Sequence, residues 1–202
     1  MKNKRIVISV PTFENIDPAC FKSIYDLEKP EGVELSFNFV NGYDCARARN
    51  IIVQQTLSAE YVYVFMVDSD MVLPQKALTM LLAADKDIIT GWYPRRRDMA
   101  GKTELFSLTD YVDFNDDCNI NISKMPHGEI IEIKGGGLGC ALIKADVFRK
   151  IGSNRWFQYI EYPNGSVLSE DLFFCHNART VHGFKIFAHT VVRCGHVTKY
   201  VQ

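Results

Sequence analysis

Two carboxylates stand at the end of the most apolar segment of the chain. The unbroken apolar and aromatic run at residues 61–67 leads directly into Asp68-Ser69-Asp70. In an open α/β sheet, ligands gather beyond the carboxyl ends of the strands. Residues i and i+2 of an extended segment point the same way, so Asp68 and Asp70 could address one ion. Their oxygens suit Mg²⁺ or Mn²⁺, and such an ion can bridge a diphosphate and neutralise a leaving group. An ordinary turn is the alternative, because Asp and Ser are common turn residues.

Alternating strands and helices would position this acidic pair. Strands are expected at residues 5–10, 33–40, 61–67 and 88–90. The helices expected between them cover residues 19–27, 44–57 and 75–84. This alternation predicts an α/β fold with a mostly parallel sheet flanked by helices.

The second half of the chain is less regular and predicts a smaller antiparallel or irregular region. Short strands are expected at residues 129–133, 138–143, 184–187 and 191–194. Ser169 is a suitable N-cap for a helix to about residue 181, with Glu170 and Asp171 in its first turn. The run Gly135-Gly136-Gly137 predicts either a plain hairpin turn or a turn that lets the backbone approach a sugar closely.

Composition and length favour one ordinary globular domain over residues 1–202. The formal net charge of -1 gives no global field toward DNA or anionic lipid, so a nucleic-acid role would need a local basic patch. No apolar run reaches membrane-spanning length, and the one after the basic first residues is too short for a signal peptide. The six cysteines form no Cys-x-x-Cys pair, which favours reduced thiols. We therefore expect a cytoplasmic protein with no membrane partner.

Several motifs together resemble family-two glycosyltransferases of the GT-A fold. Gly42-x-x-x-Ala46-x-Ala48-Arg49-Asn50 precedes the strand that ends in Asp68-Ser69-Asp70, and the opening strand runs into Pro11-Thr12-Phe13. The other matching blocks are Gly136 to Gly152, Ser169-Glu170-Asp171 and Cys194-Gly195-His196. These blocks occur in the order that the family shows. The resemblance implies a metal-dependent transfer of a sugar from a nucleoside diphosphate, with a UDP-sugar favoured, to a hydroxyl acceptor.

The resemblance also implies a role for individual residues. Asp70, Asp68 and His196 would hold Mn²⁺ or Mg²⁺, and Asp68 would also contact the donor. Arg49 would lie near the nucleotide or brace Asp68, since its guanidinium can pair with phosphate or carboxylate. The other expected substrate contacts are Pro11, Thr12 and Glu14 along the base and ribose, together with Asn50, Trp92 and Gly136. Residues 1–97 would form the nucleotide-binding half and residues 98–202 the acceptor-binding half.

Asp171 would be the general base for an inverting transfer, with Glu170 beside it. Two adjacent carboxylates can have opposed pKa shifts, one partly neutral and the other ionised. The chain departs from the family pattern at Asn41, where longer members often have an acid that contacts the nucleotide. It also has no Gln-x-x-Arg-Trp element, which argues against a processive polysaccharide synthase.

A basic and aromatic stretch follows the strand expected at residues 88–90. It consists of Gly91-Trp92-Tyr93-Pro94 and then Arg95, Arg96 and Arg97. The aromatic rings could stack on a sugar or base, and the arginines could grip the phosphates of a DNA acceptor. Some small bacteriophage enzymes of this type glycosylate hydroxymethylated DNA bases, which is an analogy only. A solvated loop with one packed aromatic ring is the alternative.

Two other functions remain open from the sequence. A nucleotidyltransferase also uses carboxylates and a divalent ion at a sheet edge, but it normally has a Gly-rich, basic phosphate loop after the first strand. Residues 11–18 contain no Gly, Arg or Lys. A non-catalytic module that binds a sugar or a nucleic acid is the second alternative.

Overall fold

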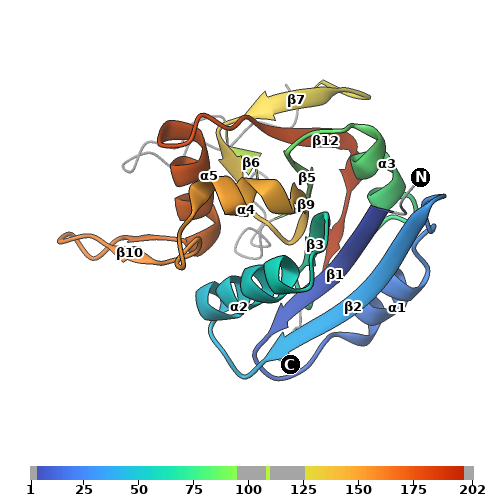
Figure 1. The fold of residues 1–202 in the computed structure, drawn as a ribbon, viewed down its shortest axis with the longest axis horizontal. Helices are drawn as coiled ribbons and strands as arrows, with labels where there is room; N and C mark the ends of the chain where they lie inside the picture. Colours follow the sequence, from blue (N-terminus) through green and yellow to red (C-terminus); the bar gives the residue numbers. More distant parts are fainter. Residues whose placement is uncertain (1–3, 95–107, 110–125, 198–202) are drawn as a thin grey trace, which may run out of the picture.

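A seven-stranded sheet forms the centre of the computed structural model, which describes residues 4–94, 108–109 and 126–197 (Figure 1). The strand order is β2-β1-β3-β9-β5-β12-β7. The strands are β1 (Lys4–Thr12), β2 (Val33–Asn41), β3 (Tyr63–Val67), β5 (Ile88–Trp92), β7 (Ile130–Ile133), β9 (Cys140–Lys144) and β12 (Ile186–Arg193). Parallel pairing joins β1 to β2 and β3, and β5 to β12, whereas β9 and β7 pair antiparallel with their neighbours. Five of the seven strands therefore point the same way, and the predicted mostly parallel sheet is confirmed.

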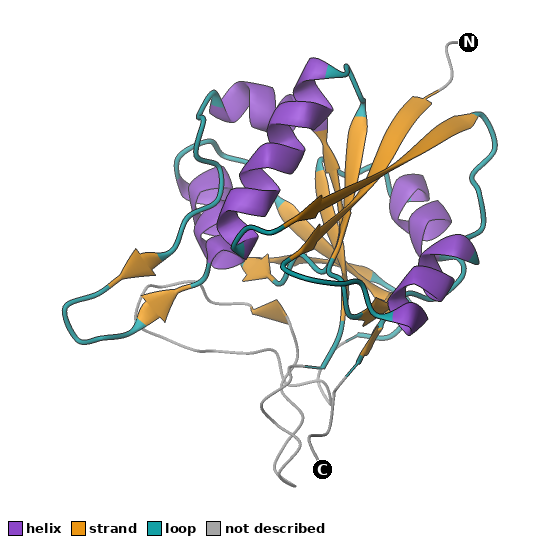
Figure 2. Cartoon of the chain, turned by 90° about the horizontal axis from the view of Figure 1, so that it is seen from below, coloured by secondary structure: helices purple, strands orange, loops and turns teal. Residues whose placement is uncertain are grey.

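Helices cover both faces of this sheet (Figure 2). They are α1 (Pro18–Tyr25), α2 (Cys45–Ser58), α3 (Ala77–Ala83), α4 (Ala145–Ile151) and α5 (Glu170–Thr180). Because side chains alternate along a strand, β1 contributes Val7 to one core and Ile6 and Ile8 to the other. The first core includes residues of α2, α4 and α5, and the second includes residues of α1 and α3. No helix within the described ranges has the length and apolar character needed to cross a membrane.

Three short strand pairs complete the described structure. β4 (Met71–Val72) pairs with β13 (Gly195–His196), and this pairing brings the late histidine next to the Asp68–Asp70 segment. β6 (Leu108–Thr109) pairs with β8 (Gly135–Gly136). β10 (Ile160–Glu161) and β11 (Val167–Leu168) form a hairpin that projects from the body of the molecule (Figures 1 and 2).

The structure differs from the sequence-based expectation in the last strand of the sheet and in the short strand pairs. The two final strands expected at residues 184–187 and 191–194 are one strand, β12, with an irregular register between Ala188 and Arg193. Its alternating burial between Ile186 and Arg193 continues through the polar pair His189 and Thr190, of which Thr190 is buried, so this pair interrupted the apolar pattern without ending the strand. The β10–β11 hairpin was not predicted, because its short strands carry little periodic signal.

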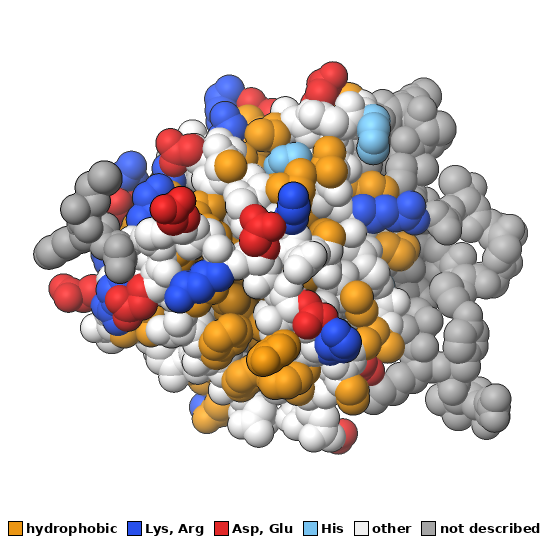
Figure 3. All heavy atoms as spheres, turned by 90° about the vertical axis from the view of Figure 1, so that its right-hand side faces the viewer, with side chains coloured by type: hydrophobic (Ala, Val, Ile, Leu, Met, Phe, Trp, Pro, Cys, Tyr) orange, Lys and Arg blue, Asp and Glu red, His pale blue; other side chains and the backbone are white. Residues whose placement is uncertain are grey.

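Exposed aromatic side chains gather at one edge of the sheet. Figure 3 shows hydrophobic side chains grouped on the face that carries β2 and α1. The large exposed hydrophobic residues of these two elements are Phe21, Tyr25, Phe37 and Phe39. Phe37 is 54% exposed on the edge strand β2. It can therefore serve as the exposed control when a buried phenylalanine is replaced.

Replacing Phe148 by Ala should lower the free energy of unfolding by about 3–5 kcal/mol. Phe148 is fully buried on α4, and its ring lies 5.6 Å from that of Phe174 and 6.3 Å from that of Phe157. Urea denaturation followed by circular dichroism would measure the loss. The Phe37→Ala control should change stability by no more than about 0.5 kcal/mol. Equal losses in the two variants would contradict this assignment of the core.

Candidate functional site

The acidic segment after β3 forms a turn. The amide of Met71 donates to the carbonyl of Asp68 at 3.1 Å, and Ser69 and Asp70 lie in the turn that this bond closes. The expectation of an extended segment with both carboxylates pointing the same way was therefore wrong. The alternative of a turn was correct for the backbone. As a result Asp68 is directed to Arg49, whereas Asp70 is directed to His196.

Arg49 is a buried cation that joins two carboxylates from distant parts of the chain. Its residue is 1% exposed on α2. Its Nη2 lies 2.7 Å from Oδ1 of Asp68, and its Nη1 lies 2.5 Å from Oε1 of Glu170. A buried charge is tolerated only when it is paired and hydrogen-bonded. Here the guanidinium of Arg49 is paired with both carboxylates, and each carboxylate is paired with the guanidinium. Of the two roles expected for Arg49, the structure shows the one that braces Asp68.

Glu170 is a buried carboxylate paired with a cation. It is 6% exposed and accepts a hydrogen bond from Arg49. Burial raises the pKa of both Cys45 and Tyr159, and the nearby charge of Glu170 adds to each shift, so both groups keep their protons. This carboxylate thus ties the start of α5 to α2, which makes Glu170 a positioning residue in this structure.

Asp171, the next residue, has a different environment. It is partly exposed, and its carboxylate accepts from the hydroxyl of Ser169 and, at 2.7 Å, from the amide of Leu172. Burial, reinforced by the negative charge of Glu170, raises the pKa of Asp171 to about 6, although Arg49 opposes the shift. Ser169 occupies the N-cap as expected, but its hydroxyl bonds to Asp171 and makes no capping bond to the backbone. A carboxylate with this pKa is suited to accept a proton near neutral pH.

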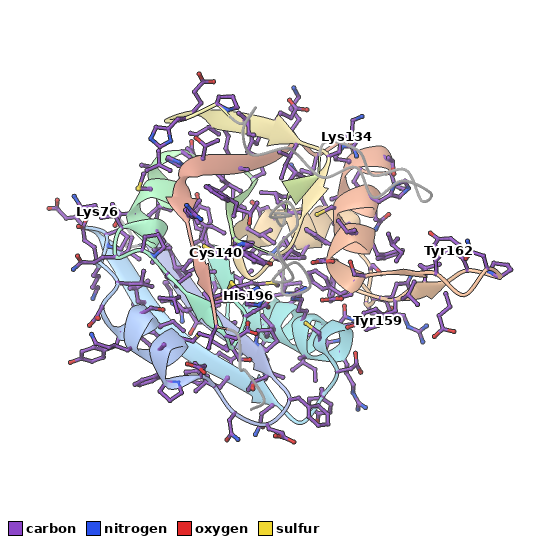
Figure 4. The ribbon with its side chains drawn as sticks, turned by 180° about the vertical axis from the view of Figure 1, so that it is seen from behind. Lys76, Lys134, Cys140, Tyr159, Tyr162 and His196 are labelled. Carbon is purple, nitrogen blue, oxygen red and sulfur yellow. The ribbon has the colours of Figure 1, made fainter. Side chains whose placement is uncertain are left out.

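Asp70 and His196 meet at the carboxyl end of β3. Oδ2 of Asp70 lies 3.3 Å from Nε2 of His196, and both side chains are largely buried. The other ring nitrogen, Nδ1, lies 2.8 Å from the carbonyl oxygen of Pro94. Because a carbonyl only accepts, Nδ1 carries a hydrogen, and Nε2 is the nitrogen directed to Asp70. Figure 4 labels His196 near the middle of the molecule, on β13, which pairs with β4.

The chemistry of this pair fits a divalent ion. Within the described residues, no group of three or more His, Cys, Asp or Glu side chains is arranged to hold a metal. The predicted set of three is therefore not assembled, because Asp68 is turned to Arg49. Asp70 and His196 still offer one oxygen and one nitrogen. Mg²⁺ is commonly held by one or two carboxylates together with substrate phosphates and water, and Asp70 alone could supply the carboxylate, whereas an imidazole nitrogen such as that of His196 suits a transition-metal ion.

The loop after β1 lies beside the acidic turn. The amide of Asp17 donates to the carbonyl of Ser69 at 2.8 Å. Pro11 is buried, Glu14 is exposed, and the hydroxyl of Thr12 donates to the carbonyl of Asn15 at 2.7 Å. These three predicted contacts of the base and ribose thus lie at the carboxyl end of β1, next to β3. Their role in binding stays a prediction.

Three other predicted substrate contacts are engaged in packing. The side-chain amide of Asn50 exchanges two hydrogen bonds with the backbone of Phe157, at 2.7 and 3.1 Å. Trp92 is 5% exposed, and its Nε1 donates to the carbonyl of Thr190 at 2.8 Å. Gly136 is buried in β8. Asn50 therefore positions the segment around Phe157, and a stacking role for Trp92 would require its ring to be uncovered.

The basic run lies outside the described residues. Arg95, Arg96 and Arg97 were expected to contact a DNA acceptor, and the structure does not describe them. That expectation stays a prediction from the sequence.

Four residues of the site were not assigned a role from the sequence. Cys45 precedes Arg49 by one helical turn, so its position on the same face of α2 was a usable signal. The hydroxyl of Tyr93 accepts from the amide of Gly139 at 3.0 Å. A Cβ at Gly139 would lie 2.8 Å from Oδ2 of Asp68, so glycine is required there by space alone. No sequence pattern pointed to Tyr159, because the β10–β11 hairpin separates it from Glu170 along the chain.

Comparisons with known proteins agree with this fold. The model of the Anp1 family, a GT-A-like mannosyltransferase family, matches residues 43–119. No protein among those with curated functions matches the sequence. The structure of A197 from STIV superposes with a TM-score of 0.65 at 17% sequence identity, covering 96% of this chain and 86% of that one. GalNAc-T7, crystallised with UDP, GalNAc and Mn²⁺, gives a TM-score of 0.62 at 12% identity.

The GalNAc-T7 match covers 96% of this chain but 44% of the other, so the chain spans less than half of that protein's length. The chain has the GT-A fold that its motifs predicted. Together with the Anp1 match, this fold supports a glycosyltransferase in general terms.

Replacing Arg49 by Met should lower the free energy of unfolding by about 3–5 kcal/mol, because it leaves the buried Glu170 and the partly buried Asp68 without their cation. Arg47→Met, on an exposed position of the same helix, is the control and should cost about 0.5 kcal/mol or less. Urea denaturation of the three proteins would measure the difference. If Arg49→Met unfolds at the same urea concentration as the parent, the ion-pair network does not stabilise the fold.

Proposed function

We propose that the chain is a metal-dependent glycosyltransferase that moves a sugar from a nucleoside diphosphate to a hydroxyl acceptor. The observation that carries this proposal is the meeting of Asp70 and His196, 3.3 Å apart, at the carboxyl end of β3. The GT-A fold and the Anp1 match support sugar transfer. The presence of UDP and Mn²⁺ in the GalNAc-T7 crystal favours a UDP-sugar as donor and a divalent ion as cofactor.

In this proposal Asp70 and His196 hold Mn²⁺ or Mg²⁺. The hydrogen bond from Nδ1 of His196 to Pro94 fixes the ring and its tautomer, as partners behind metal ligands commonly do. When bound, the ion would neutralise the charge of the departing diphosphate. Asp68 acts through the turn, since its bond to Arg49 fixes the backbone from which Asp70 projects.

Asp171 is the proposed base of the reaction. Its carboxylate takes the proton of the acceptor hydroxyl as that oxygen attacks the anomeric carbon and the bond to the diphosphate breaks. Attack from the face opposite the leaving group inverts the anomeric configuration. Glu170 holds the start of α5 through Arg49, so the adjacent Asp171 keeps a fixed position.

The donor side of the proposal uses the first half of the chain. Pro11, Thr12 and Glu14 lie along the base and ribose, next to the acidic turn. Residues 1–97 bind the donor and residues 98–202 the acceptor within one domain, which we place in the cytoplasm.

Asp70→Asn should reduce metal-dependent turnover roughly 100-fold or more, because it removes a charged ligand of the ion. Release of UDP from a panel of UDP-sugars, with Mn²⁺ and after its removal by chelation, would measure this. Asp146→Asn, at an exposed position of α4, is the control and should match the parent. Full Mn²⁺-dependent turnover in Asp70→Asn would refute the proposed metal site.

The rate of transfer should rise with pH through about 6 and become constant above about 7, because the proposed base must be ionised. Since the pKa of Asp171 is about 6, its carboxylate is mostly protonated at pH 5 and mostly ionised at pH 7. Asp171→Asn should lower kcat by about 10²–10⁴-fold and abolish this dependence. An unchanged profile in Asp171→Asn would exclude Asp171 as the base.

The same shift gives a test on the folded state alone. A carboxyl whose pKa is raised by folding favours the native state at low pH and loses that contribution as pH rises through about 6. The stability of the Asp171→Asn variant relative to the parent should therefore increase between pH 4 and pH 8 in urea denaturation.

A further inference from the structure

The β10–β11 hairpin projects from the body beside the start of α5, where the proposed base lies (Figures 1 and 2). We propose that Tyr159, at the root of this hairpin, is the platform on which a neutral sugar acceptor stacks. This inference rests on the proposed glycosyltransferase function and names its acceptor class.

Tyr159 is held beside the acidic pair while its ring stays accessible. The residue is 44% exposed, and the carboxylate of Glu170 lies close enough to contribute to the raised pKa of its hydroxyl. Figure 4 shows Tyr159 where the hairpin joins the body of the molecule. A ligand on the Tyr159 ring would therefore lie near the start of α5, whose first turn carries both Glu170 and Asp171.

The root of the hairpin is fixed by buried contacts. Asn50 on α2 exchanges two hydrogen bonds with the backbone of Phe157. The Phe157 ring stacks on Phe174 of α5 with a centroid distance of 4.9 Å, and Nε1 of Trp156 donates to the carbonyl of Phe148. Tyr159 follows this anchored segment by two residues. A ring that is already fixed loses little freedom when a ligand stacks on it, which favours binding.

The charge of the hairpin distinguishes between classes of acceptor. Residues 156–168 contain one acid, Glu161, and no Lys, Arg or His. A polyanion such as DNA is bound through cations that neutralise its phosphates, and residues 156–168 offer none, although the exposed Arg155 directly precedes them. The negative face of an aromatic ring attracts the polarised C–H groups of a sugar ring. A neutral glycoside therefore fits Tyr159 better than a nucleic acid.

Transfer assays with two kinds of acceptor would test the inference. The probes are a panel of neutral methyl hexosides and a DNA oligonucleotide that contains hydroxymethylcytosine. Tyr159→Ala should raise the KM for the accepted hexoside about tenfold or more, the loss expected for an aromatic platform. Tyr159→Phe, which keeps the ring, should stay within about threefold of the parent. The control Val167→Thr, at an exposed position of β11, should match the parent both in donor hydrolysis without acceptor and in the KM for the hexoside.

Several results would overturn the platform without touching the proposed function. These are an unchanged KM in Tyr159→Ala, transfer to the oligonucleotide but to no hexoside, and donor hydrolysis by the parent without transfer to any hexoside. Loss of donor hydrolysis in Tyr159→Ala would show that the ring acts only by supporting Glu170. Failure of the parent to hydrolyse any donor would instead count against the proposed function.

A binding measurement keeps the platform testable even in that last case. Saturation-transfer NMR with the methyl hexosides, in the presence of UDP and Mg²⁺, should show contact with the parent protein and with Tyr159→Phe. The signal should be lost in Tyr159→Ala. Equal signals in all three proteins would refute the platform independently of turnover.

Discussion

The buried ion pairs of Arg49 determine how the acidic residues of the site are arranged. Its guanidinium contacts Asp68, 19 residues away, and Glu170, 121 residues away, and so joins the end of β3 to the start of α5. Each of these charges would be costly to bury alone, and replacing all of them by packed apolar groups is often as stable. The value of such a network lies in the single arrangement that it permits. Here that arrangement defines the position of two backbone segments from opposite halves of the chain.

One arginine thereby separates the members of two neighbouring acidic pairs. Asp68 and Glu170 bind Arg49, whereas the adjacent Asp70 and Asp171 are directed elsewhere, Asp70 toward His196. The two carboxylates bound to the guanidinium hold the end of β3 and the start of α5 in place. The raised pKa of Asp171 follows from the same arrangement, because burial and the charge of Glu170 outweigh the more distant Arg49. Within each pair, one acidic residue is thus bound to Arg49 and the neighbouring one is not.

The sequence predicted the parts of the structure that depend on local pattern. Strong apolar runs and helix caps identified most of the sheet, and the acidic motif was correctly placed at the end of β3. Side-chain direction was not predictable in the same way. The extended geometry assumed for Asp68 and Asp70 was wrong because a turn and a distant arginine determine where they point. Trp92 was expected to meet a substrate, but the carbonyl of Thr190, a tertiary partner, holds it inside.

The insertion of β9 between β3 and β5 makes the two predicted halves dependent on one another. Gly139, which directly precedes β9, accepts a hydrogen bond from the amide of Asp68 and donates one to Tyr93. A side chain at this position would collide with the Asp68 carboxylate. The residues that position the acidic turn therefore come from both 1–97 and 98–202. Arg49 bonds to the carboxylate of Asp68 and the carbonyl of Gly139 to its amide, so one residue of the acidic turn is held by partners from both of these ranges.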